Sequence, residues 1–143
     1  MARVLIADDS ADIRTLLIRI LSRDEHAISE VADGAAAYQR LITERYDIAI
    51  LDVMMPQIDG LTLCRMLRDT PGLGHLGIVV ISAASSEVAA LAAGADAFLS
   101  KPFLPSTFLE TVATLASGGH APRMLRPAGR PRQRRKQSAR LTS

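Results

Sequence analysis

The sequence predicts an α/β fold, (βα)5, in which strands and helices alternate to build a doubly wound, five-stranded parallel sheet. Two observations predict this fold. Short, almost wholly apolar runs recur along residues 1–116, and the segments between them carry apolar residues at helical spacing. Strands that alternate with helices of about ten residues imply right-handed crossovers and a parallel sheet that helices cover on both faces.

The apolar runs are predicted to be the strands. Short runs of this kind are typical of strands that are buried on both faces of a sheet. They comprise residues 4–7, 27–32, 48–51, 78–82 and 97–100.

The segments between the strands are predicted to be helices. They comprise residues 10–23, 34–46, 60–70, 87–95 and 104–116, of which the fourth is the shortest and is rich in alanine. Asp9 or Ser10 is available to cap the first helix. The apolar residues that we expect to face the sheet from these helices are Ile13, Leu16, Leu17, Ile20, Leu21, Ala37, Leu41, Ile42, Leu63, Met66, Leu67, Phe108, Val112 and Leu115.

Charge is divided unevenly along the chain. Residues 1–116 hold 9 basic and 15 acidic side chains, whereas residues 117–143 hold 8 basic and no acidic ones. The last segment also has almost no apolar periodicity, so we expect one domain at 1–116 followed by a disordered basic tail at 117–143. The tail fits three interpretations: a solvated segment without a partner, a segment that binds nucleic acid or another polyanion, and one that docks on an acidic protein.

The composition also bears on location. The sequence has no stretch close to the ~20 apolar residues of a membrane span, and its N-terminal apolar run is too short for a signal peptide. The single cysteine, Cys64, cannot form an internal disulfide, and we expect it to be a small buried residue. We therefore expect a cytoplasmic protein without a membrane span.

Polar side chains follow four of the predicted strands at the point where each strand ends. They are Asp8 and Asp9 after the first strand, Asp52 after the third, Ser82 at the end of the fourth and Lys101 after the fifth. Because the carboxyl ends of parallel strands meet at one edge of a sheet, we expect these side chains to lie close together. Clustered carboxylates repel one another unless a cation intervenes, and Mg²⁺ prefers carboxylate, water and phosphate oxygens. The edge therefore predicts a metal site suited to phosphoryl transfer.

The motifs at these positions resemble those of a known family. They are "ADD" after the first strand, "LDVMMPQIDG" after the third, "ISA" at the end of the fourth and "AGADAFLSKPF" around the fifth. In these motifs and in their order, residues 3 to 116 are similar to the CheY-like receiver domain of response regulators in two-component signalling. The resemblance implies a flavodoxin-like fold and a single-domain response regulator of a phosphorelay. Such a protein is not an enzyme, although it assists its own phosphorylation and dephosphorylation.

The resemblance also implies a role for each site residue. Asp52 would be the phosphoacceptor, which takes a phosphoryl group from a sensor histidine kinase or a histidine phosphotransfer protein. Mg²⁺ or Mn²⁺ would be bound directly by Asp9, Asp52 and the backbone carbonyl of Met54, and mostly through water by Asp8.

A second set of residues would couple phosphorylation to a change of shape and of partner binding. Lys101 and Ser82 would bind phosphoryl oxygens, Phe98 would be the aromatic switch, and the peptide bond between Lys101 and Pro102 would be cis. Phe98 fits a plain core residue equally well. Only 18 residues separate Ser82 from Lys101, fewer than is usual in the family, so the fourth helix is expected to be shortened.

Some alternatives stay open at this point. The Asp8–Asp9 pair on its own also fits a helix cap. The chain could instead be a nucleic-acid-associated protein that acts through its basic tail. A phosphatase with an aspartyl-phosphate intermediate is disfavoured, because such enzymes usually place a second carboxylate two residues after the nucleophile, where this sequence has Met54.

Overall fold

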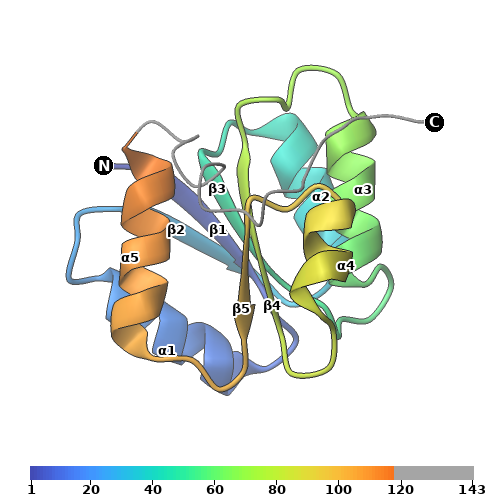
Figure 1. Cartoon of the computed structure of the whole chain (residues 1–143). Helices are drawn as coiled ribbons and strands as arrows, with labels where there is room; N and C mark the ends of the chain where they lie inside the picture. Colours follow the sequence, from blue (N-terminus) through green and yellow to red (C-terminus); the bar gives the residue numbers. More distant parts are fainter. Residues whose placement is uncertain (118–143) are drawn as a thin grey trace.

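The computed structural model of the chain describes residues 1–117. Five strands and five helices alternate along these residues, as the sequence predicts (Figure 1). They are β1 (Arg3–Ala7), α1 (Ala11–Leu21), β2 (Ala27–Val31), α2 (Gly34–Thr43), β3 (Ile48–Asp52), α3 (Gly60–Asp69), β4 (Gly77–Ser82), α4 (Glu87–Ala92), β5 (Ala97–Ser100) and α5 (Pro105–Ala116). Every boundary lies within three residues of the predicted one. The predicted tail, apart from Ser117, lies outside the described residues.

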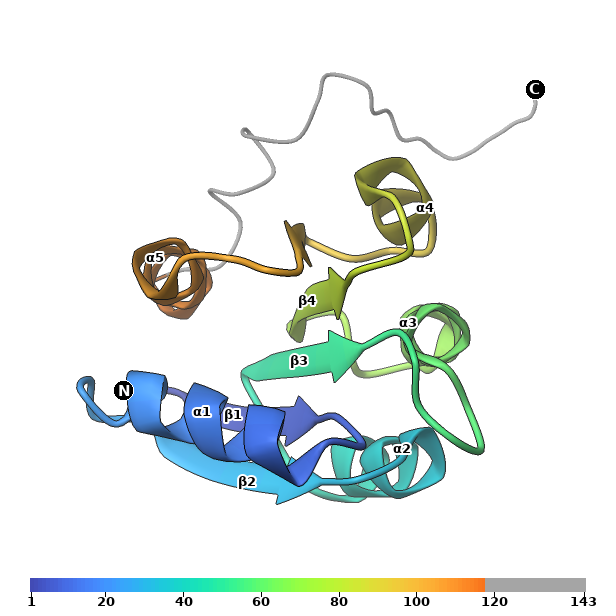
Figure 2. The ribbon, with the colours of Figure 1, turned by 90° about the horizontal axis from the view of Figure 1, so that it is seen from below.

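The strands form one parallel sheet in the order β2-β1-β3-β4-β5. Its registers align the last residues of neighbouring strands: Ala7 pairs with Leu51, Asp52 with Ile81, and Ser82 with Ser100. The chain therefore leaves β1, β3, β4 and β5 at the same edge, and Figure 2 looks onto the molecule from that side. The order reverses between β1 and β3, which is where ligands bind in open sheets of this kind.

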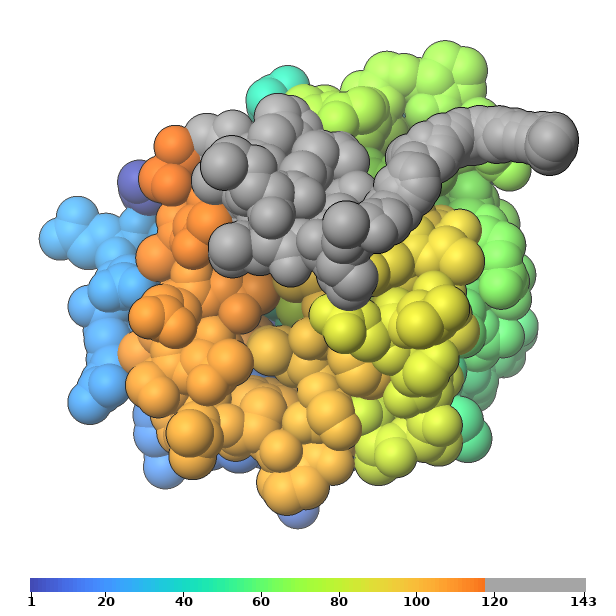
Figure 3. Space-filling model, viewed as in Figure 1, coloured from blue at the N-terminus to red at the C-terminus, as the bar shows by residue number. Residues whose placement is uncertain are grey.

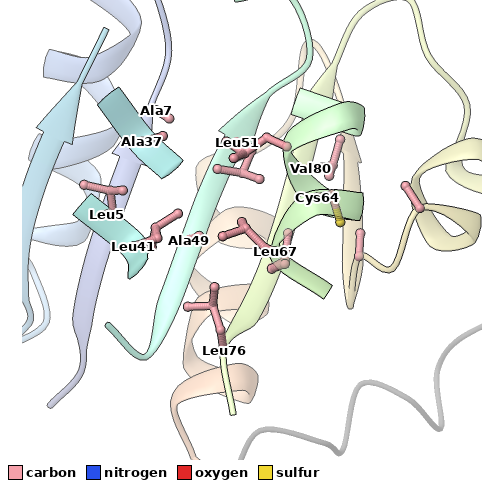
Figure 4. Packing of buried hydrophobic residues seen from close by; sticks show 14 of the residues in the cluster. Leu5, Ala7, Ala37, Leu41, Ala49, Leu51, Cys64, Leu67, Leu76 and Val80 are labelled. Carbon is pink, nitrogen blue, oxygen red and sulfur yellow. The ribbon is translucent and has the colours of Figure 1, made fainter. Parts of the chain in front are cut away.

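Helices cover both faces of the sheet. In Figures 1 and 2, α1 and α5 lie on one face, whereas α2, α3 and α4 lie on the other. Successive strand residues point to opposite faces, so Leu5 packs towards α2 and α3 while Val4 and Ile6 pack towards α1 and α5. Figure 4 shows the first of these clusters, in which Leu41 and Leu67 meet the sheet. The predicted burial of Cys64 is confirmed, and the residue lies in this cluster.

Four helices begin with a side-chain cap. Ser10, Asp33, Asp59 and Ser86 each accept a hydrogen bond from the backbone N–H three residues later, which satisfies a donor that has no partner within the helix. The fifth, α5, starts with Pro105, which needs no such partner.

Two residues that we expected to face the sheet do not. Leu16 is 47% exposed and Ile42 is 40% exposed. Successive helix residues are about 100° apart around the axis, so Leu16 points away when Leu17 faces the core, and Ile42 does so when Leu41 faces it. The other predicted inward residues are buried or partly buried, and Phe108 and Val112 of α5 are among the most buried of them.

The last helix–strand pair before α5 is built from the shortest helix and the shortest strand of the fold. Helix α4 has only six residues, and β5, with four, forms the outer edge of the sheet beyond β4. In the space-filling view, atoms of the β5 region lie between those of α5 and those of α4 (Figure 3). None of the helices within residues 1–117 is long and apolar enough to cross a membrane.

An ion pair that the sequence patterns did not identify holds this part of the fold to α3. The Arg68 guanidinium donates to Asp96 Oδ2 at 2.7 Å and to the backbone carbonyls of Gly94 and Leu76 at 2.8 Å each. Asp96 Oδ2 also accepts the N–H of Ile78 at 2.9 Å. Because the Asp96 side chain is only 3% exposed, this pair ties the chain just before β5 to β4 and α3 in a largely dry environment.

Removing the Asp96 carboxylate should destabilise the domain. Asp96→Ala leaves a largely buried guanidinium and the N–H of Ile78 short of an acceptor, so we expect the free energy of unfolding in urea to fall by about 3 kcal/mol. Asp69→Ala removes an exposed carboxylate from the end of α3 and should change it by less than about 0.5 kcal/mol. Equal effects of the two substitutions would contradict the role given to the ion pair.

Candidate functional site

Three carboxylates meet where β1 and β3 end. Asp8 and Asp9 follow β1 directly, and Asp52 is the last residue of β3. One carboxylate oxygen from each lies within 4.8 Å of those from the other two. Asp8 and Asp52 are buried, whereas Asp9 is exposed. The structure thus brings together the three acids that the sequence singles out, with one side of the cluster open to solvent.

Lys101 reaches this cluster from the far side of β4. Its Nζ donates to Asp52 Oδ1 at 2.9 Å and lies 3.6 Å from Asp8 Oδ2. The backbone supports this reach, because the N–H of Lys101 donates to the carbonyl of Ser82 at 2.9 Å. The peptide bond between Lys101 and Pro102 is cis.

The charges at the site are unbalanced. Burial is the main cause that raises the pKa of Asp52; the negative charges of Asp8 and Asp9 raise it further, and the Lys101 ammonium opposes both. For Lys101, burial alone would lower the pKa, but the hydrogen bond and charge of Asp52, helped by Asp8, raise it above its ordinary value. One ammonium therefore faces three carboxylates and offsets their repulsion only in part.

This donor set fits a hard divalent cation. Three carboxylates within 4.8 Å of one another supply oxygen ligands and excess negative charge, and the exposed Asp9 leaves room for the waters that Mg²⁺ retains. The raised pKa of Asp52 points the same way, because a cation among the carboxylates would relieve the repulsion that contributes to it.

The remaining predicted site residues lie around the cluster. Ser82 is buried beside Asp52 on the neighbouring strand, and its Oγ accepts the N–H groups of Ala84 at 3.0 Å and Ser85 at 2.8 Å. Its hydroxyl therefore engages the loop before α4. Phe98 is half-buried and packs on the α3 and α4 side of β5, away from the acids. Met54 lies in the loop after β3 and is 67% exposed.

Two glycines shape the loop that follows Asp52. A Cβ on Gly60 would overlap the backbone carbonyl of Asp52, so only glycine lets α3 start this close to the acid. Gly34, the first residue of α2, donates its N–H to the carbonyl of Pro56 at 3.3 Å, and a Cβ there would overlap the carbonyl of Ile58. The loop is therefore packed between the starts of α2 and α3.

Sequence patterns did not single out Gly34, nor Arg14, whose guanidinium donates to the backbone carbonyl of Asp8 at 2.7 Å. The contact of Gly34 with the loop joins positions far apart in the chain, so local spacing gives no sign of it. Arg14 is partly buried, but its position next to Ile13 does not distinguish it in the sequence from Asp12, which is exposed on the other side of Ile13.

Comparison with known proteins agrees with this geometry. Residues 4–113 match the family model of the response regulator receiver domain. The transcriptional regulatory protein GltR of Pseudomonas aeruginosa is 40% identical over 115 residues, which cover 78% of this chain and 48% of GltR. The chain thus spans about half the length of the curated relatives it matches.

Solved structures show the same likeness. The receiver domain of the Francisella response regulator 1452 superposes with a TM-score of 0.77 at 28% identity, covering 82% of this chain and 98% of that domain. The chemotaxis response regulator CheY4 of Vibrio cholerae gives a TM-score of 0.74 at 30% identity, covering 80% of this chain and 98% of CheY4.

The raised pKa of Asp52 predicts how stability depends on pH. In the folded state Asp52 binds its proton more tightly than in the unfolded state. The folded state therefore loses stability as the pH rises from the pKa of an unfolded Asp through the raised pKa of folded Asp52, and this loss of stability persists at higher pH. Without metal at pH 7, Asp52→Asn should therefore unfold at a higher urea concentration than the wild type, and the two should converge in acid. Added Mg²⁺ should stabilise the wild type more than the variant.

Asp12→Asn is the matched control for this measurement. It removes one negative charge from the exposed first turn of α1 and should give no gain in stability at pH 7. An Asp52→Asn variant that is less stable than the wild type in chelator at pH 7 would disprove the electrostatic reading of the site.

Proposed function

The chain belongs to the family of response regulator receiver domains, which act in two-component signalling, and from this we propose that Asp52 is its phosphoacceptor. In this proposal Asp52 takes a phosphoryl group from the phosphohistidine of a sensor histidine kinase or of a histidine phosphotransfer protein. The observation that carries the proposal is the position of Asp52: a buried carboxylate at the end of the central strand β3, 2.9 Å from the Lys101 ammonium.

The proposed step is a direct displacement at phosphorus. A carboxylate oxygen of Asp52 attacks the phosphorus, the bond from phosphorus to the histidine nitrogen breaks, and the imidazole leaves with that electron pair and takes up a proton. The product is an acyl phosphate on Asp52. Apart from the nucleophilic oxygen of Asp52 itself, positioning and charge neutralisation are proposed to supply most of the catalysis.

The surrounding side chains have distinct parts in this step. Lys101 already pairs with Asp52 and can move its ammonium onto a phosphoryl oxygen as the carboxylate charge is used. Ser82 can donate its hydroxyl proton to a second oxygen once the loop that it now holds shifts. Asp8, Asp9, Asp52 and the backbone carbonyl of Met54 would hold Mg²⁺ or Mn²⁺. The cation, when bound, offsets the negative charge of the carboxylates and the phosphoryl group.

We propose that phosphorylation acts as a switch. In this proposal the chain is not an enzyme in the usual sense. Movement of Ser82 towards the phosphoryl group would free space above β4. Phe98, which is half-buried on β5 opposite Val80 of β4, could then turn inward. The change would alter the face formed by α4, β5 and α5, and with it the binding of a downstream protein in the cytoplasm. GltR is named a transcriptional regulatory protein, but the output of this chain stays a proposal.

The rival function, nucleic-acid binding through the tail, rests on charge alone. Its residues, apart from Ser117, lie outside the described part of the chain, so it stays a prediction. So does the expectation that the receiver acts as a single domain.

Phosphoryl uptake from acetyl phosphate tests the proposal. In Mg²⁺, intact-protein mass spectrometry should show one added phosphoryl group on the wild type and none on Asp52→Asn, because an amide oxygen is a poor nucleophile. Asp59→Asn changes the cap of α3 in the same loop, seven residues on, and should still be phosphorylated. A chelator should abolish uptake. Uptake that persists in Asp52→Asn, with the group mapped to another residue, would refute the assignment.

A further inference from the structure

Arg14 of α1 turns back over the start of its own helix onto the loop that carries two of the acids. Its guanidinium donates from Nη1 to the backbone carbonyl of Asp8 at 2.7 Å and from Nε to Glu30 Oε1 at 2.7 Å. The Arg14 side chain is only 17% exposed, while that of Glu30 is 47% exposed. The guanidinium is thus held between the end of β2 and the segment Asp8–Asp9.

The carbonyl that Arg14 contacts belongs to the peptide unit that joins Asp8 to Asp9. The orientation of this unit sets the directions in which both carboxylates leave the backbone. Strand β1 ends at Ala7, one residue earlier. Beyond it, the N–H of Asp8 is fixed by the carbonyl of Val31 at 3.2 Å, and its carbonyl is fixed by Arg14. Arg14 therefore supplies this carbonyl with the hydrogen-bond donor that a neighbouring strand would supply within a sheet.

We propose that Arg14, itself held by Glu30, is a positioning residue for the cation site. Its planar guanidinium fork binds two acceptors in a fixed geometry, which the single ammonium of lysine cannot reproduce. In this way it orients the Asp8–Asp9 peptide so that both carboxylates face the cation. The inference rests on the proposed function, because it takes the cluster of three acids as the Mg²⁺ site.

The direction in which Mg²⁺ affinity changes when Arg14 is replaced distinguishes a positioning role from an effect of its charge alone. A positive charge beside a cation site repels the cation, so loss of Arg14 would strengthen Mg²⁺ binding if only its charge mattered. Loss of a group that orients the ligands weakens binding instead. Lysine at position 14 would behave like arginine in the first case and would still weaken binding in the second.

Isothermal titration with Mg²⁺ on the full chain makes this comparison. We expect the dissociation constant to rise about tenfold in Arg14→Met and by a smaller factor in Arg14→Lys. Glu30→Gln keeps an acceptor for Arg14 but loses the charge. Its dissociation constant for Mg²⁺ should therefore lie between those of the wild type and Arg14→Met. The double variant Arg14→Met/Glu30→Gln should be no weaker than Arg14→Met, because the two residues act as one unit.

Arg19→Met is the matched control, since it removes the same charge from an exposed position on the same helix. It should leave Mg²⁺ affinity within about twofold of the wild type. Urea unfolding in chelator gives the stability of each variant, so that affinities are compared only where the proteins are folded. If Arg14→Met does not fold, Arg14→Lys and Glu30→Gln carry the test.

The outcomes distinguish the two claims. Mg²⁺ binding in Arg14→Met that equals or exceeds that of the wild type overturns the inference and leaves the proposed function standing. An Arg19→Met variant as weak as Arg14→Met overturns it as well, because position on the loop would then not matter. A wild type that binds no Mg²⁺ overturns both the inference and the metal-dependent function on which it rests.

Discussion

Repulsion among three carboxylates is the constraint around which this domain is arranged. Asp8, Asp9 and Asp52 are held within 4.8 Å of one another, two of them buried, and Lys101 neutralises only one of the three charges. Such a cluster costs stability in the absence of a cation; burial is the main cause of the raised pKa of Asp52, and the charges of Asp8 and Asp9 add to it. In the proposed function, the same unfavourable arrangement would make the site receptive to a divalent cation, whose positive charge offsets those of the carboxylates. Strain of this kind at a reaction centre is a source of switching as well as of binding.

The rest of the fold serves to keep these acids in place. The register of the parallel strands pairs Asp52 with Ile81, so Asp52 and Ser82 lie at the ends of neighbouring strands. The layers of helices on both faces exclude water from these strands. The loops beyond the strands, where repulsion could pull the acids apart, are pinned individually. Gly34 and Gly60 bring helix starts against the loop after β3, and Arg14 holds the loop after β1. At the edge of the sheet, β5 pairs with β4 and carries Lys101 to Asp52, and the Arg68–Asp96 pair adds a tie between this part of the chain and α3.

Most of the fold and the three clustered acids could be predicted from the sequence, because both depend on local patterns. The strands were visible as apolar runs, and Asp52 stood out because it ends one of them. Hydrophobicity alone placed Leu16 and Ile42 in the core, although rotation about the helix axis turns both outward. The contacts of Arg14 with Asp8, of Gly34 with Ile58 and of Arg68 with Asp96 could not be predicted, since each depends on where separate segments meet after folding. These are contacts that support the site, whereas the predicted residues are those that would react.

A titration of the Asp52 carboxyl carbon by ¹³C NMR tests the central electrostatic claim most directly. In chelator, the pKa of Asp52 should lie above the ordinary value of an aspartate, because burial and the charges of Asp8 and Asp9 outweigh Lys101. Saturating Mg²⁺ should lower it, since the cation favours the ionised form. A pKa at or below the ordinary value without metal, or one that Mg²⁺ leaves unchanged, would contradict the account of Asp52 as a carboxylate held against repulsion beside a cation site.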